Sequence, residues 1–223
     1  MNFVRFSAGP ARCGRSRAVA RTAARRRFAV FSVALAAVLA SIVVTTGSAS
    51  AGILPGLCLD ADAQQVGQGG AIIQWDCDTT DNYQRWVNEP GPTTSSGVVY
   101  QLEVLGPLDD KHENFCLDAN AQEVYPGGAI VQWVCNNNDP YQWWLEHYLG
   151  GGVWSFQNYG ALMYQNSADC LDVDAQHLGD LGPIVQWGCN SNDVYQEWEE
   201  ESSPLGGTVF PNLGAALATS GGV

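Results

Sequence analysis

Cysteine is the residue type whose spacing is most regular in this chain. After residue 51, six cysteines form three pairs, and the members of each pair lie 19 positions apart in nearly the same text, as in "CLDADAQQVGQGGAIIQWDC". Six cysteines allow many pairings, but equivalent positions in equivalent units are expected to form equivalent bonds. Zinc motifs separate paired cysteines by only about two to four residues, so a metal site is not expected. The spacing predicts the disulfides Cys58–Cys77, Cys116–Cys135 and Cys170–Cys189.

The other residues with catalytic potential form no recognisable catalytic arrangement. His112, His147 and His177 are tied by spacing to no nucleophilic serine or cysteine, because every cysteine after residue 51 is assigned to a disulfide. A glycosidase needs two carboxylates on either side of the scissile bond. The chain has 23 acidic residues, yet no non-repeated pair of them stands out. The sequence therefore predicts no enzymatic activity and no cofactor.

Calcium is the metal that the repeated acidic residues could bind. Asp60 and Asp62 are one residue apart, and Asp172 and Asp174 repeat this pattern. The second unit has Asn120 at the later position, and no loop of further oxygen ligands follows in any unit, as a calcium site requires. No metal is therefore predicted.

The paired cysteines belong to a longer internal repeat, which indicates a fold built from one unit used three times. Residues 58–86, 116–144 and 170–198 align without gaps as C-L-D-x-x-A-Q-x(5)-G-x-I-x-Q-W-x-C-x(3)-D-x-Y-Q-x-W. Runs such as "AIIQW" are short, β-branched and bounded by Gly, Asp and Asn, which is typical of strands. No segment after residue 51 shows a helical period. The chain is therefore predicted to be all-β.

The C-terminal segment carries a partial fourth copy. Residues 207–218, "GTVFPNLGAALA", match residues 153–164 at a displacement of 54, which is also the distance from Cys116 to Cys170. A strand candidate precedes the second and third units, but only "GILPGL" precedes Cys58. We therefore expect residues 207–218 to return beside the first unit and close a threefold barrel that otherwise has an open edge. The alternative is a frayed tail rich in Gly and Ala.

Residues 1–51 are predicted to be a secretory signal peptide. Eight arginines precede an apolar run over 28–44, and an Ala-x-Ala pattern ends at Ala51. An uncleaved membrane anchor is the alternative, and "RRRF" leaves open whether export follows the general or the twin-arginine route. Residues 52–223 suit one domain with a single core, and the expected location is outside the cell.

Removal of residues 1–51 makes the chain strongly acidic. Only Arg85 and Lys111 then face 23 carboxylates, a formal charge of −21. Such a surface repels phosphate backbones and anionic lipids, so neither nucleic acid nor membrane is expected as a partner.

The opening Cys-Leu-Asp, the central Gln-Trp-x-Cys and the closing Gln-x-Trp together resemble the ricin-B-type lectin family of carbohydrate-binding β-trefoils. The resemblance covers essentially all of residues 52–223, and a three-part motif that occurs three times is specific. It implies a β-trefoil of three internal repeats, each with one disulfide and one shallow sugar site.

The resemblance also implies a role for three residues of each unit. The Asp of the opening triplet accepts hydrogen bonds from sugar hydroxyls, the aromatic residue two positions before the second Cys stacks on the pyranose, and the Gln of Gln-x-Trp completes the site. A pyranose has an apolar face and a rim of hydroxyls, which suits one flat aromatic ring and a few fixed polar groups. The implied residues are Asp60, Trp75 and Gln84, then Asp118, Trp133 and Gln142, then Asp172, Trp187 and Gln196.

Structural interpretations stay open beside these roles. The carboxylates could bond loop amides, as Asp often does in turns, and the stacking tryptophans could belong to the core. The tryptophans of Gln-x-Trp, at 86, 144 and 198, are expected to be buried.

Two departures from the family pattern occur in all three units. Tyr83, Tyr141 and Tyr195 replace the usual Asn before Gln-x-Trp, and we treat them as auxiliary binding residues. The Gln that often lies four positions before the second Cys is replaced by Ile73, Val131 and Val185. Glutamine occupies the next position instead, at 74, 132 and 186, and should face the opposite side of the strand.

The sequence therefore predicts a secreted lectin that binds a neutral oligo- or polysaccharide, of galactoside or xylan type, through up to three weak sites. One alternative is a β-trefoil that binds or inhibits a protein through its variable loops. Another is a stand-alone module that targets a separate glycoside hydrolase.

Overall fold

The computed structural model describes residues 53–220, so the predicted signal peptide lies outside the described residues. This part of the chain holds thirteen strands and five short helical segments. The strands are β1 (Ile53–Ala61), β2 (Gly70–Asp78), β3 (Trp86–Thr94), β4 (Gly97–Val104), β5 (Phe115–Ala119), β6 (Gly128–Val134), β7 (Trp144–Gly150), β8 (Val153–Asn158), β9 (Asp169–Val173), β10 (Ile184–Gly188), β11 (Trp198–Glu199), β12 (Glu201–Ser202) and β13 (Thr208–Val209). The helical segments are α1 (Leu105–Lys111), η1 (Pro140–Gln142), η2 (Ala161–Gln165), η3 (Val194–Gln196) and α2 (Leu213–Ser220).

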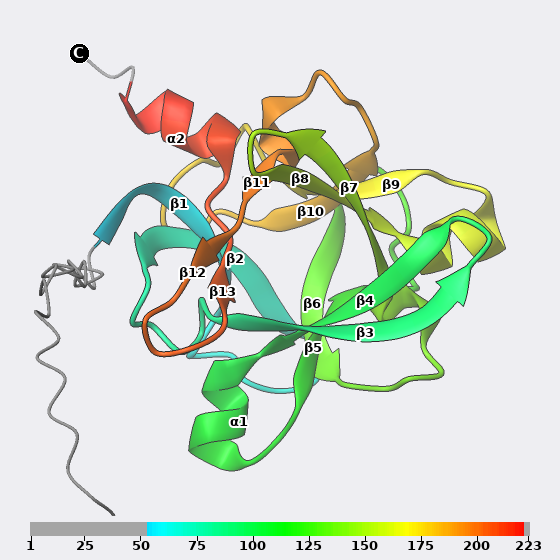
Figure 1. Ribbon diagram of the computed structural model, residues 1–223, viewed down its shortest axis with the longest axis horizontal. Helices are drawn as coiled ribbons and strands as arrows, with labels where there is room; N and C mark the ends of the chain where they lie inside the picture. Colours follow the sequence, from blue (N-terminus) through cyan, green and yellow to red (C-terminus); the bar gives the residue numbers. More distant parts are fainter. Residues whose placement is uncertain (1–52, 221–223) are drawn as a thin grey trace, which may run out of the picture. The chain divides into compact units, whose positions relative to one another are not determined.

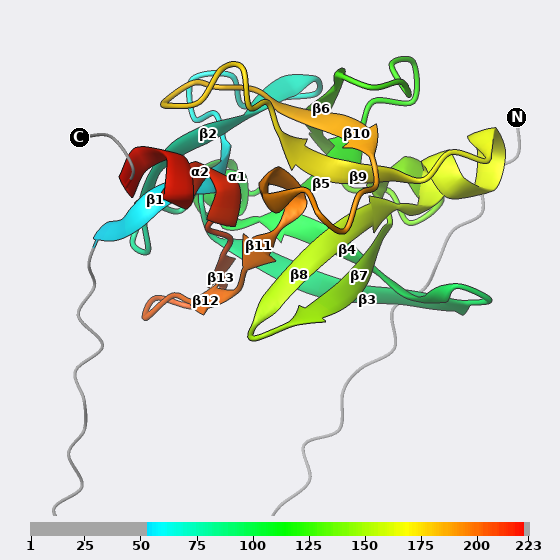
Figure 2. The same cartoon turned by 90° about the horizontal axis from the view of Figure 1, so that it is seen from above.

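The strands repeat as three lobes. Lobe 1 comprises β1–β4, lobe 2 comprises β5–β8 and lobe 3 comprises β9–β13. Each lobe opens with an antiparallel pair, namely β1 with β2, β5 with β6 and β9 with β10. The lobe's disulfide joins the first strand to the end of the second strand or to the residue just after it. Strands β2, β6 and β10 gather on one side of the domain, and the hairpins β3–β4 and β7–β8 lie on the other (Figure 2). The sugar-site residues predicted from the sequence lie on the first strand pair of each lobe and on the turn after it.

Backbone hydrogen bonds join the lobes to one another. Strand β4 pairs with β5 and β7, and β8 pairs with β9 and β11. The C-terminal segment lies against lobe 1: Leu59 N donates to Phe210 O (3.1 Å), Asn212 N donates to Leu57 O (3.0 Å), and β13 pairs with β3. Figure 1 shows β13 and α2 beside β1 and β2, although the sequence separates them by more than a hundred residues. The contacts run all the way round the three lobes.

Equivalent residues of the three lobes build the hydrophobic core. A central cluster takes one leucine from each first strand (59, 117 and 171), one isoleucine from each second strand (72, 130 and 184) and the three Gln-x-Trp tryptophans (86, 144 and 198). These tryptophans are fully buried, and each indole Nε1 donates to the carbonyl of its lobe's core leucine at 3.0–3.3 Å. The expected burial of these tryptophans is therefore confirmed.

All three predicted disulfides are present, linking Cys58 to Cys77, Cys116 to Cys135 and Cys170 to Cys189. Each closes a loop of similar length and stabilises the fold by about 3 kcal/mol in the chain-entropy model. The bonds tie the first two strands of each lobe together directly below the candidate site.

The expectation of no helix is wrong at three equivalent places. Segments α1, η2 and α2 each follow the last barrel strand of a lobe. An asparagine side chain bonds the first turn in two of these regions: Asn158 Oδ1 accepts from Ala161 N (2.9 Å) and Asn212 Oδ1 accepts from Ala215 N (3.0 Å). A side-chain oxygen at this position satisfies a free amide of the first turn. Within residues 207–218, β13 therefore covers only Thr208–Val209, and the second half of the segment lies in α2.

Between residues 53 and 220, no helix has both the length and the apolar character needed to span a bilayer.

Candidate functional site

The predicted aspartate and tryptophan of each unit lie on one face of an antiparallel strand pair. In lobe 3, Asp172 on β9 lies opposite Val185 on β10, and Trp187 follows two residues later. Directly opposite residues, and residues two apart along a strand, project from the same face. The same register places Asp60 opposite Ile73 and Asp118 opposite Val131. The fold therefore brings the predicted Asp and Trp together in every lobe.

The lobe 3 pair lines a hollow of about 390 Å³. Its walls come from the strand pair, from the loop after β9, from the turn that holds η3 and from one glycine of lobe 2. The lining residues are Gly127, Asp172, Val173, Asp174, Ala175, Gln176, Val185, Trp187, Asp193 and Tyr195. A hollow of this size with one aromatic wall and several polar groups suits a small polar ring compound.

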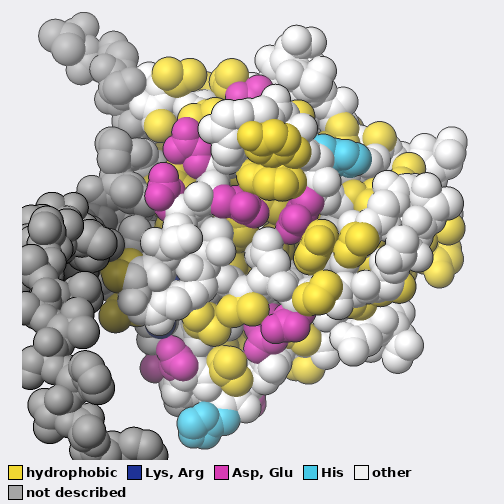
Figure 3. All heavy atoms as spheres, viewed as in Figure 1, with side chains coloured by type: hydrophobic (Ala, Val, Ile, Leu, Met, Phe, Trp, Pro, Cys, Tyr) yellow, Lys and Arg dark blue, Asp and Glu magenta, His cyan; other side chains and the backbone are white. Residues whose placement is uncertain are grey.

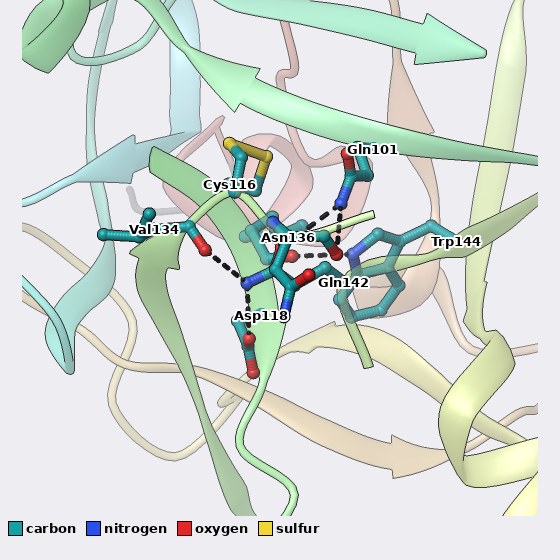
Figure 4. Close-up of a disulfide and its surroundings, with 9 residues drawn as sticks. Gln101, Cys116, Asp118, Val134, Asn136, Gln142 and Trp144 are labelled. Carbon is teal, nitrogen blue, oxygen red and sulfur yellow. Dashed lines mark hydrogen bonds between the residues drawn. A yellow bond between two sulfur atoms is a disulfide. The ribbon is translucent and has the colours of Figure 1, made fainter. Parts of the chain in front are cut away.

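The Gln-x-Trp glutamines lie behind the aspartates and are fully committed to the protein. Gln142 is buried, and its Nε2 donates to Asp118 Oδ2 (3.0 Å) and to the Val134 carbonyl (3.0 Å). Its Oε1 accepts from the Asn136 amide (2.7 Å). Figure 4 shows the amide of Gln142 between these partners, next to the disulfide. Gln196 repeats the arrangement and donates to Asp172 Oδ2 at 2.7 Å.

Burial raises the pKa of each aspartate. The pKa of Asp118 and of Asp172 rises to about 6, and that of Asp60 to about 7, chiefly because the carboxylates are desolvated. The glutamine amides act in the opposite direction by stabilising the charged form. Nearby acidic groups add to the rise, with Asp139 acting on Asp118 and Asp193 acting on Asp172. Carboxylates held this way are available to accept hydrogen bonds but lose their charge in mildly acidic solution.

The loop amides are bonded by other residues. Asp62, Asn120 and Asp174 each accept from the backbone amide two positions later, at 2.8–3.1 Å. Within residues 53–220, we find no backbone amide that donates to the carboxylate of Asp60, Asp118 or Asp172.

The tryptophans in front of these aspartates are at the surface, with Trp133 41% exposed, Trp187 47% exposed and Trp75 partly exposed.

Comparison with known proteins agrees with this geometry. The model of the ricin-type β-trefoil lectin domain matches residues 50–198. The chain belongs to this family. The predicted family and the predicted all-β trefoil fold are therefore confirmed. Among curated proteins, none matches the sequence.

Solved structures resemble this ricin-type domain at low sequence identity, and the two with TM-scores of 0.50 or above share its fold. One is a designed threefold symmetric protein, ThreeFoil, with 19% identity, a TM-score of 0.51, and coverage of 65% of this chain and 90% of that chain. A mosquitocidal holotoxin matches with 16% identity, a TM-score of 0.50, and coverage of 65% and 15%. An exo-β-1,3-galactanase from Clostridium thermocellum matches with 18% identity, a TM-score of 0.47, and coverage of 63% and 25%. Identities this low show the fold alone.

The tyrosines that depart from the ricin-type pattern pack on glycines 54 residues apart. A Cβ built on Gly106, Gly160 or Gly214 would lie 2.6–2.7 Å from the ring of the tyrosine in front of it. Only glycine therefore lets the ring approach so closely. Tyr195 also lines the lobe 3 hollow, whereas the Tyr83 hydroxyl donates to Asp110 on α1 (2.9 Å).

The displaced glutamines of the ricin-type pattern face inward and connect the lobes. Gln74, Gln132 and Gln186 are 0–1% exposed, and each Nε2 donates to a backbone carbonyl of another lobe at 3.3–3.4 Å. Strand alternation predicted that these glutamines face away from the tryptophans, but it cannot predict which lobe they bond. In lobe 3, Val185 lines the hollow at the position where the family often has glutamine.

Sequence reasoning did not single out two residues that line the lobe 3 hollow. Gln176 and Asp193 belong to the repeated motifs D-x-x-A-Q and D-x-Y-Q. Their repetition in all three units could have indicated a role in the site. The Asp193 carboxylate also accepts a hydrogen bond from the Tyr195 amide (3.1 Å). This bond caps η3 and helps to hold Tyr195 at the hollow.

Proposed function

We propose that the protein is a secreted lectin that binds neutral glycans of galactoside or xylan type, without catalysis. The observation that carries the proposal is the lobe 3 hollow, where an exposed Trp187 and a fixed Asp172 face one ring-sized space. The indole offers a flat apolar wall to the C–H face of a pyranose. The carboxylate offers charge-assisted acceptors to neighbouring hydroxyls.

In this proposal the glutamines position the aspartates and do not contact the sugar. Gln142 and Gln196 are buried, and both of their polar ends already bond protein groups. A sugar hydroxyl that displaced them would break these bonds. Each glutamine therefore fixes the direction in which its aspartate presents the second carboxylate oxygen.

The charge distribution supports a neutral ligand. Asp172, Asp174 and Asp193 surround the lobe 3 hollow, and acidic side chains are spread over the face drawn in Figure 3. Arg85, one of the two cationic side chains after residue 51, is 5% exposed and donates to the carbonyls of Leu205 and Gly206. Sulfated or uronic glycans would meet repulsion rather than a cationic partner.

Export is part of the same proposal. Disulfides form and persist in oxidising compartments, and each lobe has one. The disulfides support the secretory reading of residues 1–51.

The test is binding of the oxidised protein to immobilised galactosides, xylans and glucans. A triple variant, Asp60→Asn, Asp118→Asn and Asp172→Asn, should bind at least about tenfold more weakly, because a charge-assisted hydrogen bond contributes about 1.5–3 kcal/mol. The matched control, Glu89→Gln, Glu113→Gln and Glu201→Gln, removes the same charge at exposed positions outside the lobe 3 hollow and should bind normally. Equal binding by both variants would refute the assigned site, and no binding by the wild type would turn the search to protein partners.

A further inference from the structure

The three lobes differ at one position of the turn before the second strand. This position holds Gly69 before β2, Gly127 before β6 and Leu181 before β10. All three have left-handed backbone, with φ of 82°, 88° and 67°. Glycine adopts this conformation freely, whereas a leucine does so rarely. Leu181 is thus an unusual residue at a place where the other two lobes have the expected one.

Each of these turns bonds the strand that carries the next site's tryptophan. Gly69 N donates to Gln132 O (2.9 Å), Gly127 N donates to Gln186 O (2.8 Å) and Leu181 N donates to Gln74 O (3.0 Å). The accepting glutamines directly precede Trp133, Trp187 and Trp75. Leu181 is therefore bonded next to Trp75 in the same way as Gly69 is bonded next to Trp133 and Gly127 next to Trp187.

A side chain at this position starts against the edge of the indole ring. A Cβ built on Gly69 would lie 3.5 Å from Trp133 Cζ3, and one built on Gly127 would lie 3.6 Å from Trp187 Cζ3. These are ordinary contact distances, and the rest of a leucine side chain extends beyond them. Gly127 itself lines the lobe 3 hollow, and Leu181, whose side chain is 58% exposed, holds the equivalent position beside lobe 1.

The exposure of the tryptophans agrees with this difference. Trp133 and Trp187 are 41% and 47% exposed, whereas Trp75 is less exposed than either. Asp180 strengthens the contact of this turn with lobe 1, because its Oδ1 accepts from the Asp76 amide (3.1 Å). Lobes 1 and 2 have Gln68 and Pro126 at the positions equivalent to Asp180, and neither residue has a carboxylate.

We propose that Leu181 closes the lobe 1 sugar site and that the protein binds glycan through two lobes, lobe 2 and lobe 3. This inference rests on the proposed function for its ligand, but the accessibility of Trp75 can be measured without any ligand. Trp75 then serves as a packing residue for the turn that ends at Gly182. Avidity on a polymer comes from two sites rather than three.

The first experiment reads each site separately with lactose and with xylohexaose. Protein with ¹⁵N-labelled tryptophan gives one indole Nε1–H signal for each of its eight tryptophans, assigned by single Trp→Phe variants. In the wild type, the sugar that binds should shift the signals of Trp133 and Trp187 and leave that of Trp75 in place. Leu181→Gly should make the Trp75 signal shift as well. A wild-type Trp75 that shifts together with the other two would overturn the proposal.

Two substitutions at Gly127 provide the converse test in lobe 3. Gly127→Leu should abolish the Trp187 shift and leave the Trp133 shift intact, because it recreates the lobe 1 arrangement. Gly127→Ala has the same left-handed backbone as Gly127→Leu but adds only a Cβ, so the Trp187 shift should fall less in Gly127→Ala than in Gly127→Leu. If Gly127→Leu is folded by circular dichroism and Trp187 still responds, the covering role of leucine is wrong.

The second experiment uses no sugar, so it separates this proposal from the proposed function. Limited oxidation with N-bromosuccinimide, followed by peptide mass mapping, measures the accessibility of each indole. Trp75 should react more slowly than Trp133 and Trp187 in the wild type and as fast as they do in Leu181→Gly. If neither sugar shifts any signal but this change in reactivity occurs, the lectin function fails and the closure stands. If Trp75 is oxidised at the same rate in the wild type and in Leu181→Gly, Leu181 does not close the lobe 1 site.

Discussion

At the residue scale, each candidate site depends on a carboxylate that is both desolvated and held in place. Asp118 and Asp172 are 6% exposed, and a buried glutamine amide bonds one oxygen of each. Burial raises the pKa and the glutamine lowers it, and burial dominates. The site is therefore charged at neutral pH and close to losing that charge.

The first prediction is that glycan binding weakens as pH falls through about 6. Protonation of Asp118 and Asp172, whose pKa values are about 6, removes the charge-assisted acceptors for the sugar hydroxyls. The indole NMR titration at pH 5 to 8 measures this. The Asp118→Asn and Asp172→Asn double variant should bind weakly at every pH. A wild-type affinity that does not change across this range would contradict the assigned role.

Stability should respond to pH in the opposite direction. The folded protein holds protons on Asp118 and Asp172 at pH values where the unfolded chain, with ordinary carboxyl pKa values near 3.8, has released them. The contribution of these groups is greatest at low pH and is lost as pH rises toward 6. Relative to the wild type, the Asp→Asn double variant should gain melting temperature at pH 7 and show less or no gain at pH 4.

A third residue-scale prediction concerns the positioning glutamine. Gln196→Glu keeps an acceptor for the Asn190 amide but places a second carboxylate against Asp172. Like charges at hydrogen-bond distance raise the pKa of one carboxyl, so the midpoint of the binding loss seen at Trp187 should move to higher pH. The Trp133 midpoint in lobe 2 is the internal control. A glutamine that contacted the sugar directly would instead change affinity without moving the midpoint.

At the element scale, repetition made much of the fold predictable. The repeated cysteine spacing predicted all three disulfides, and the repeated Asp and Trp fell on one face of each first strand pair. Helices such as η2 and α2 were missed because five to eight residues are too few to show a period, and because they depend on local hydrogen bonds that Ala161 N and Ala215 N donate to asparagine side chains. The commitment of Gln142 to Asp118 was also hidden, because it depends on a contact across 24 residues.

The inter-lobe glutamines support a prediction about stability. Gln132 Nε2 lies 3.4 Å from Asp62 O, a long hydrogen bond, and its buried Oε1 has no partner among the described residues. Asp62 O also accepts from Gln65 N (3.0 Å), so it remains bonded without Gln132. Gln132→Met, which is similar in volume and apolar, should change the free energy of unfolding by less than about 1 kcal/mol or stabilise the fold.

The matched variant at the same position is Gln132→Ala, which leaves a cavity beside Gly70 and should destabilise by about 1–3 kcal/mol. Urea unfolding of both variants measures the difference. If Gln132→Met were as destabilising as Gln132→Ala, the long bond to Asp62 would be more important than its geometry indicates.

At the whole-molecule scale, the end of the chain adds a second set of contacts between lobe 3 and lobe 1, beside those made by the turn before β10. Phe210 and Phe156 are fully buried and pack edge to face with ring centroids 5.3 Å apart. Asn158 and Asn212 make the same bonds at equivalent places, with each Nδ2 donating 2.8 Å to the carbonyl of the tyrosine in its own lobe. The C-terminal segment thus makes contacts of the same kind as an internal one.

The last prediction follows from this equivalence. If residues 207–218 close the barrel, Phe210→Ala should destabilise the protein as much as Phe156→Ala, by about 3–5 kcal/mol in each case, because both substitutions leave a similar cavity in one core. A frayed tail would instead make Phe210→Ala nearly neutral, with Phe156→Ala still costly. Chemical unfolding of the two variants, with the disulfides intact, distinguishes these outcomes. Deletion from Gly207 onward should lower the melting temperature by more than either substitution, because it also removes the bonds from Phe210 O and Asn212 N to β1.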